Sequence, residues 1–190
     1  MAEFDFQIFW RDVDTRDESF LDLLFKAGCD DATVFFKDGY LCLDFSRESR
    51  DAETAVVSAI RDIHRSGIGG SIERVEPEDL ASLAEIANRV GVTRSALQKY
   101  ARGSSKVGKD FPRPVLNIAS PRRELFSTFE VMKWMHLKHR VEIPSQALEL
   151  FRTISMTNQA LVIAKARKNA DVGHLVEQLT AIEANKRKHA

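Results

Sequence analysis

The sequence predicts an α+β chain in three parts, and three observations support that prediction. The first 76 residues alternate between segments of strand and helix periodicity. Residues 83–102 have the pattern of two short helices around a glycine turn, and the chain has helical spacing from Val141 onward. We therefore expect domains at 1–76, 77–140 and 141–190, each small, as a chain of 190 residues allows.

Four strands and two helices are expected in the N-terminal part. The strand segments alternate apolar and polar residues, and the helix segments repeat apolar residues every three to four positions. Asp38-Gly39 is a strong hairpin signal between the second and third strands. In chain order the elements are expected at 4–10, 17–28, 32–37, 41–45, 51–66 and 71–75. This β-α-β-β-α-β order is that of a ferredoxin-like domain.

The charges divide the chain although they sum to zero. Residues 1–80 carry 9 Lys and Arg against 19 Asp and Glu, a net charge of −10, and residues 81–190 carry 19 against 9, a net charge of +10. Within the second group, residues 81–140 hold 12 basic and 4 acidic side chains, a net charge of +8. A basic part of this kind indicates contact with nucleic acid.

Residues 83–102 predict a helix-turn-helix. Ser82 and Glu85 form a capping box for the first helix, Gly91 supplies the freedom for a sharp turn, and Thr93 caps the second helix. The outward positions are polar and cationic, as a helix that reads DNA requires. The expected apolar undersides of the two helices are Ala84, Ile86, Ala87 and Val90, and Leu97, Tyr100 and Ala101.

The segment after this motif has the pattern of a wing. A basic, proline-containing stretch leads to two strand candidates, 115–119 and 124–127, joined by a turn at 120–123. A helix with an apolar side then begins near Thr128. For Trp134 and Tyr100 we expect core packing.

Several spaced elements between residues 82 and 136 match one known family. They are Ile86-Ala87, Val90 to Ser95, Leu97, Gly103, Phe111-Pro112-Arg113-Pro114, Phe126, Val131 and Trp134-Met135. Their pattern resembles the MerR-like winged helix of AlpA-type phage excisionases and related bacterial regulators. The chain departs from the family in its longer loop, GSSKVGKD, and in Phe126, where a Trp is usual. The whole chain also resembles actinobacterial helix-turn-helix regulators with an added N-terminal domain.

The resemblance implies that the second helix, Thr93 to Arg102, enters the major groove of double-stranded DNA. Arg94 is then the candidate for a bidentate contact to guanine, and Gln98 for a contact to adenine. The other candidates on this helix are Thr93 and Ser95 for phosphates or base edges, and Lys99 and Arg102 for the backbone. The wing would bring Arg122 and Arg123 to the minor groove or its phosphates, with Lys106, Lys109 and Arg113 tracking the backbone.

The sequence gives little indication of an enzyme, a metal site or a cofactor. Cys29 and Cys42 have neither the number nor the spacing of a disulfide framework or zinc site, and we expect semi-buried thiols. The five histidines, His64, His136, His139, His174 and His189, share no metal-ligand spacing. The N-terminus has no leader pattern and no run is long enough to span a membrane, so we expect a cytoplasmic, nucleoid-associated protein.

The C-terminal part predicts two amphipathic helices. The first is expected from Pro144, either continuous to about Asn169 or interrupted near Asn158, and the second is expected from Asp171 onward. Their apolar stripes need cover, and a symmetric partner is the commonest solution, so a homodimer through these helices is expected. The competing interpretation is a lid over the chain's own N-terminal domain.

Together these patterns predict a sequence-specific, dimeric DNA-binding transcriptional regulator and not an enzyme. An excisionase-like architectural factor that bends DNA is the alternative within the same class. A second alternative is an antitoxin-like protein whose acidic N-terminal domain binds a partner protein while the basic half regulates its own gene. A variant of it is self-inhibition, in which the acidic domain shields the basic surface.

Overall fold

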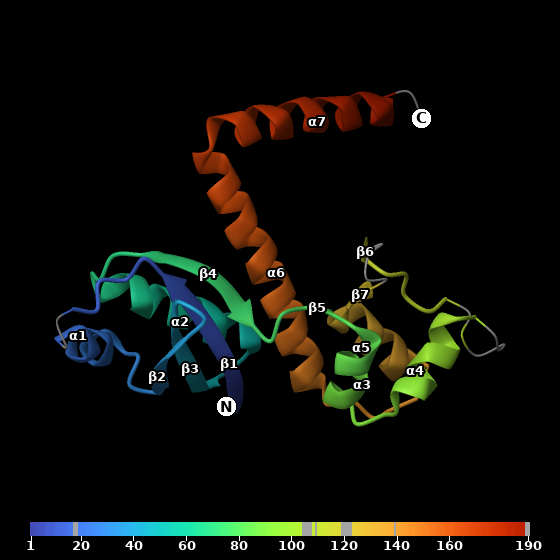
Figure 1. Ribbon diagram of the computed structural model, residues 1–190, viewed down its shortest axis with the longest axis horizontal. Helices are drawn as coiled ribbons and strands as arrows, with labels where there is room; N and C mark the ends of the chain where they lie inside the picture. Colours follow the sequence, from blue (N-terminus) through green and yellow to red (C-terminus); the bar gives the residue numbers. More distant parts are fainter. Residues whose placement is uncertain (17–18, 104–107, 109, 119–122, 139, 189–190) are drawn as a thin grey trace.

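The computed structural model describes residues 1–16, 19–103, 108, 110–118, 123–138 and 140–188, with side chains described up to residue 181. Over these residues the chain is α+β, with seven helices and two antiparallel sheets (Figure 1). The predicted α+β class is thus confirmed. Within the same ranges, no helix combines the length and the apolar character needed to cross a membrane.

The N-terminal part is a four-stranded antiparallel sheet in the order β2-β3-β1-β4. Its elements are β1 (Ala2–Arg11), α1 (Ser19–Ala27), β2 (Ala32–Lys37), β3 (Tyr40–Ser49), α2 (Ala52–Arg65) and β4 (Ser71–Glu76). All six predicted elements are confirmed, because local signals set their ends. Asp38 and Gly39 both have positive φ in the β2–β3 turn. Asp51 caps α2 by accepting a hydrogen bond from the Thr54 backbone N–H at 2.7 Å.

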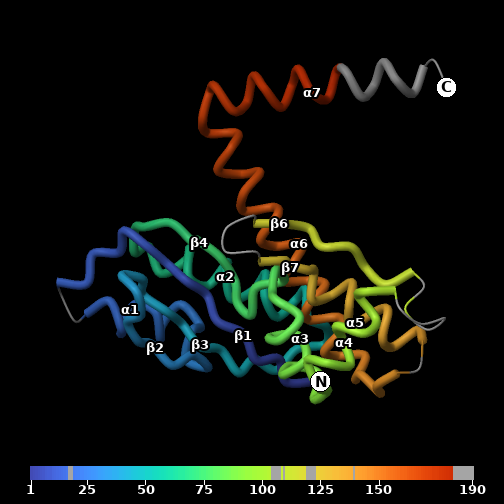
Figure 2. Tube along the Cα trace, turned by 45° about the vertical axis from the view of Figure 1, so that its right-hand side comes forward, coloured from blue at the N-terminus to red at the C-terminus, as the bar shows by residue number. Residues whose placement is uncertain are grey.

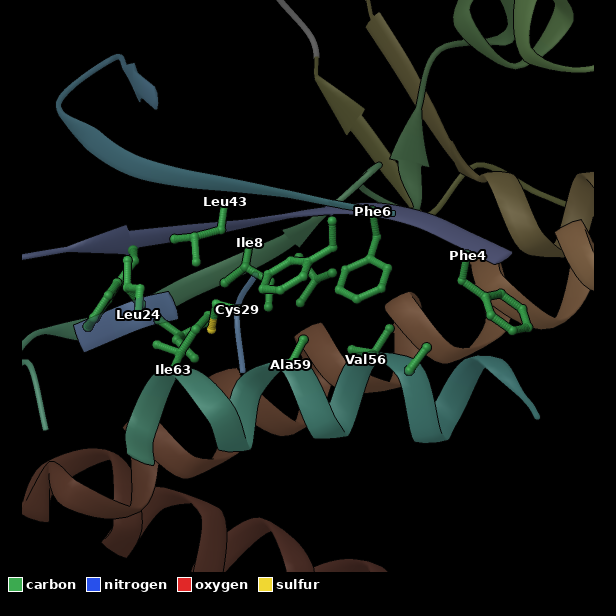
Figure 3. Packing of buried hydrophobic residues seen from close by; sticks show 14 of the residues in the cluster. Phe4, Phe6, Ile8, Leu24, Cys29, Leu43, Val56, Ala59 and Ile63 are labelled. Atoms are coloured by element: carbon green, nitrogen blue, oxygen red, sulfur yellow. The ribbon is translucent and has the colours of Figure 1, made fainter. Parts of the chain in front are cut away.

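One face of this sheet packs against helices and forms the first hydrophobic core. Phe4, Phe6 and Ile8 of β1 point toward α2, as does Leu43 of β3 (Figure 3). Helix α2 contributes five fully buried side chains to the same core: Ala52, Ala55, Val56, Ala59 and Ile63. Burial of each large apolar side chain stabilises the fold by about 1.5–3 kcal/mol. The polar residues that alternate with this set therefore lie on the opposite face of the sheet.

Arg47 of β3 is buried in this unit and joins three of its segments. Its guanidinium donates to Asp31 at 2.6 Å and to Asp62 at 2.8 Å, and it also donates to the Gly28 carbonyl oxygen at 2.7 Å. It lies 4.9 Å from the centroid of the Phe45 ring. A buried charge is tolerated when its donors are satisfied in this way. The network ties β3 to α2 and to the connection between α1 and β2.

The central part contains a second, three-stranded antiparallel sheet in the order β5-β7-β6. Its elements are β5 (Leu80–Ala81), α3 (Leu83–Arg89), α4 (Arg94–Ala101), β6 (Leu116–Ile118), β7 (Arg123–Ser127) and α5 (Thr128–Leu137). The capping box of Ser82 and Glu85 is confirmed. Strand β5 was not predicted, because a strand of two residues has no period; it pairs Leu80 with Ser127 and Ala81 with Phe126.

A second hydrophobic core holds these elements together. Trp134 of α5 lies between two aromatic rings, with centroid distances of 5.3 Å to Tyr100 and 5.0 Å to Phe111. The expectation that Trp134 and Tyr100 serve packing is confirmed. The expectation for Ala84 is wrong, since it is exposed. Helix α3 buries Leu83, Ile86 and Ala87, which lie three and four positions apart, and Ala84 points about 100° away from Leu83.

Helix α6 (Ser145–Lys168) runs between the two units and contributes to both cores (Figure 1, Figure 2). Its N-terminal residues Leu148 and Phe151 pack in the second core, and Ile154 and Leu161 pack in the first. Of the two alternatives for this segment, the structure has the continuous helix, without an interruption near Asn158. Helix α7 (Ala170–Lys188) turns away from α6 and from the rest of the chain. The division at 76 and 140 remains a prediction.

Candidate functional site

Helices α3 and α4 meet through a tight turn that fixes the position of α4. Gly91 has φ +70°, and the Val92 N–H donates to the Ala87 carbonyl oxygen at 2.9 Å. The Thr93 hydroxyl accepts a hydrogen bond from the Ala96 N–H at 3.2 Å and so caps α4. Leu97 is fully buried and anchors α4 in the second core. The polar side of α4 is thereby held outward on a packed support.

Four of the predicted DNA-binding residues line one open concavity. Arg94 and Gln98 of α4 and Arg102, its C-cap residue, lie four positions apart on one side of the helix, and Arg123 of β7 also lines the concavity. Arg94, Arg102 and Arg123 are exposed, and Gln98 is half-buried. The structure therefore brings together side chains that are up to 29 positions apart in sequence.

The charge of this concavity is mainly positive. Three arginines and one carboxylate, Glu124, line it, and the remaining lining is largely apolar or small. Nearby, hydrogen bonds from Ser82 hold the pKa of Glu85 below its ordinary value, and the charges of Arg89 and Arg123 lower it further. Glu85 thus stays ionised, and its carboxylate accepts the hydrogen bond from the Ser82 N–H in the capping box. The prediction missed Glu124, and its place beside Arg123 in the sequence was the available signal.

The other predicted residues are distributed around this concavity or away from it. Ser95 and Lys99 are exposed on α4, on the side next to Arg94 and Gln98. Arg113 lies elsewhere, in a shallow hollow that Lys133 and Trp134 also line. The extended segment around Pro112 carries it across α5, which the sequence pattern does not specify. Lys106, Lys109 and Arg122 lie outside the described residues.

No group of three or more His, Cys, Asp or Glu side chains lies close enough to hold a metal ion within the described part of the chain. Cys29 and Cys42 are free and fully buried, more so than the semi-buried thiols expected. Burial raises the pKa of the Cys29 thiol to about 11. At neutral pH this thiol is therefore protonated and a poor nucleophile.

A second charged surface lies on the sheet face that points away from α1 and α2. Glu3, Asp5, Asp44 and Glu48 are exposed there, and Glu3 stands directly opposite Glu48 in the β1–β3 register. The Ser46 hydroxyl lies between Glu3 and Asp5, 2.6 Å from a Glu3 oxygen and 2.7 Å from an Asp5 oxygen. Like charges directly opposite each other destabilise a sheet. The acidic sheet face thus has a cost in the isolated chain.

The cationic concavity at α4 and the acidic sheet face are the two surfaces from which a function can be argued. No protein-family model, curated protein or solved structure matches this chain.

Proposed function

We propose that this chain is a sequence-specific DNA-binding transcriptional regulator that acts as a dimer. The observation that carries the proposal is the concavity lined by Arg94, Gln98 and Arg102 from one helix and its C-cap and by Arg123 of a β-hairpin. Three cationic side chains and an amide on a packed scaffold suit a polyanion whose base edges present acceptors and donors.

The fold we propose for the central part is a MerR-like winged helix-turn-helix. In its favour, α3 and α4 are joined by a turn at Gly91, and the β6–β7 hairpin lies directly before α5. The short strand β5 adds to it by pairing with β7, which fixes the hairpin to the start of α3. For the N-terminal part we propose the ferredoxin-like plan, on the strength of the β2-β3-β1-β4 order.

The proposal divides the residues in and beside the concavity between base contacts and backbone contacts. Arg94, at the first position of α4, makes the bidentate contact to guanine, and Gln98, one turn later, reads adenine. Arg102 and Lys99 bind phosphates, and Arg123 reaches the backbone from the hairpin. Each base contact contributes about 1–3 kcal/mol of discrimination, and each phosphate contact adds to the salt dependence.

The test is a selection of bound sequences from a random DNA pool, followed by binding titrations. We expect a preferred site, which Arg94→Ala weakens by about 1–3 kcal/mol while relaxing the preference at one base pair. Arg102→Ala should weaken all sequences equally and reduce the salt slope by about 1. Arg61→Ala, an exposed arginine on α2, is the matched control. Binding without sequence preference, unchanged by Arg94→Ala, would overturn the proposal.

A dimer is part of this proposal because α7 carries apolar residues without cover. Val172, Leu175, Val176 and Leu179 are between 38% and 63% exposed. A helix of this kind gains stability mainly by packing its apolar face. Dimerisation would also place two α4 helices on two half-sites. Sedimentation at several protein concentrations tests it directly, and a monomer at all of them would refute it.

A second candidate function is supported by the acidic sheet face. The four exposed carboxylates around Ser46 would be relieved of their mutual repulsion by a basic partner protein. We propose this partner binding as an addition to DNA binding. Asp5→Asn with Asp44→Asn should abolish co-purification of such a partner from native cells and leave DNA binding unchanged. An identical set of co-purified proteins with the unaltered chain and the variant would count against it.

A further inference from the structure

Helix α7 presents one continuous apolar stripe. Val172, Leu175, Val176 and Leu179 follow one another at spacings of three, one and three, which places them on a single side. All four are exposed, and α7 stands apart from every element except the end of α6 in both views (Figure 1, Figure 2). Most of the stability of a helix in a protein comes from the packing of its apolar face, and α7 has no such packing within the described residues. The stripe therefore needs a receiving surface.

An apolar groove lies on the same chain, between α6 and the base of the three-stranded sheet. Six apolar side chains line it: Leu80, Val115, Phe129, Met156, Val162 and Ile163. Five of them are more than a third exposed. Asp79 fixes one wall to the other, because it accepts hydrogen bonds from the Phe129 N–H at 2.8 Å and from the Ser155 hydroxyl at 3.2 Å. The groove is thus held open by the fold.

The α7 helix of the same chain cannot turn back into this groove. Asn169 alone separates α6 from α7. Its side-chain oxygen accepts hydrogen bonds from the backbone N–H groups of Asp171 and Val172, at 3.0 and 3.3 Å, and so caps α7 in its outward direction. Two antiparallel helices need a connection of about 2–5 residues. A single residue is too short for that reversal.

The buried area distinguishes two ways in which a second copy could cover α7: pairing of α7 with α7, and exchange of α7 into the groove of the partner. A helix of 19 residues is a cylinder about 28 Å long and about 10 Å in diameter, so half of its curved surface is roughly 450 Å². Two α7 helices paired only with each other would bury roughly 900 Å² of total surface. Stable protein–protein interfaces usually bury about 1,200 Å² or more. Exchange of α7 between two chains adds two groove surfaces and roughly doubles that area.

We propose that α7 of one chain seats its apolar stripe in the groove of a second copy, and that the second copy does the same in return. This inference rests on the proposed dimer and assigns its contact surfaces. The exchange forms a closed, isologous pair. Because Leu80 belongs to β5 and Val115 directly precedes β6, the interface touches the sheet that contains the hairpin of Arg123.

The test is cross-linking between cysteines placed on the two surfaces. Leu175→Cys and Ile163→Cys are prepared as separate full-length variants, mixed, and treated with a short bis-maleimide. The native Cys29 and Cys42 are buried and give little background. We expect the mixture to form a covalent dimer that neither variant forms alone. Ala181→Cys lies on the opposite side of α7 and should not link to Ile163→Cys.

Three results would overturn the proposal. Strong linking of Leu175→Cys alone would mean that α7 pairs with α7, and an internal link in a chain carrying both cysteines would mean that α7 folds back. A monomer in sedimentation would remove the dimer itself. As a second measurement, Leu175→Glu should raise the dimer dissociation constant about 30-fold or more, and Ala181→Glu less than about 3-fold. None of these measurements involves DNA, so their failure leaves the DNA-binding proposal standing.

Discussion

Helices α6 and α7 adjoin each other in sequence and both carry apolar residues at helical spacing, but α6 alone is covered by its own chain. Helix α6 places Ile154 in the first core and Phe151 in the second, whereas every apolar side chain described on α7 is exposed. The difference lies in polar anchors. Along α6, Asn158 and Lys165 reach the backbone and side chains of β4. An apolar period predicts a helix, and directional contacts decide where it docks.

The largest effect is expected where α6 enters the first core. Ile154→Ala should lower the free energy of unfolding by about 2–5 kcal/mol, because Ile154 is fully buried and its loss leaves a cavity. Leu179→Ala on α7 is the matched control and should cost less than about 0.5 kcal/mol in the monomer. Urea denaturation of dilute protein measures both. Equal losses of unfolding free energy would mean that α7 is packed against its own chain to the same extent as α6.

Asn158 is the anchor whose removal should cost second most. Its side chain accepts from the Val75 N–H at 2.7 Å and donates to the Val75 carbonyl oxygen at 2.8 Å, so it pairs with the edge of β4. Asn158→Ala should cost about 2 kcal/mol, since two half-buried backbone groups lose their partners. Hydrogen exchange at the Val75 amide should rise with it. Gln159→Ala, at the next position, should change neither quantity by a measurable amount.

Asn158 also shows why part of the fold could not be predicted. Asparagine is a weak helix former, so the sequence left an interruption there as an alternative to a continuous helix. Its side chain is instead engaged with a strand 83 positions away, a contact that no local pattern reveals. The same holds for α1, where Leu24 is buried and the similar Leu23 and Phe25 are exposed. Elements with local signals, such as the Asp38-Gly39 turn and the Asp51 cap, were predicted correctly.

The candidate site divides in the same way. The period of α4 placed Arg94, Gln98 and Arg102 on one side, and the structure places them there. Arg123 joins them because β7 pairs with β5, a two-residue strand without a pattern of its own. Arg113 was expected nearby and lies in another hollow, because the course of an extended proline-containing segment depends on its packing. Single charges in such segments are therefore the least predictable part of the site.

Removal of α7 should leave the stability of the single chain almost unchanged. A chain ending at Asn169 should keep its free energy of unfolding within about 1 kcal/mol of the full-length monomer, because the described part of α7 contributes to neither core. The same truncation should abolish concentration-dependent association. Thermal unfolding at low concentration and sedimentation measure the two effects. A truncated chain that unfolds well below the full-length monomer would show that α7 supports its own chain.

The smallest effect is expected at the last anchor of α6, and it depends on pH. The Lys165 ammonium donates to a Glu73 carboxylate oxygen at 2.7 Å, and this hydrogen bond holds the pKa of Glu73 below its ordinary value of 4.5. The unfolded chain therefore takes up a proton at Glu73 before the folded chain does. The resulting stability is present above pH 4.5 and is lost as pH falls through the lowered pKa of Glu73.

Because both side chains are about one-third exposed, the pair contributes at most about 1 kcal/mol. Lys165→Met should lower the free energy of unfolding by that amount at pH 7 and by nothing at the acid end of this window. Lys168→Met, at the exposed end of the same helix, is the control and should leave the pH profile of stability unchanged. If Lys165→Met lowers the free energy of unfolding equally at acid and neutral pH, the loss comes from packing of the lysine stem and not from the ion pair.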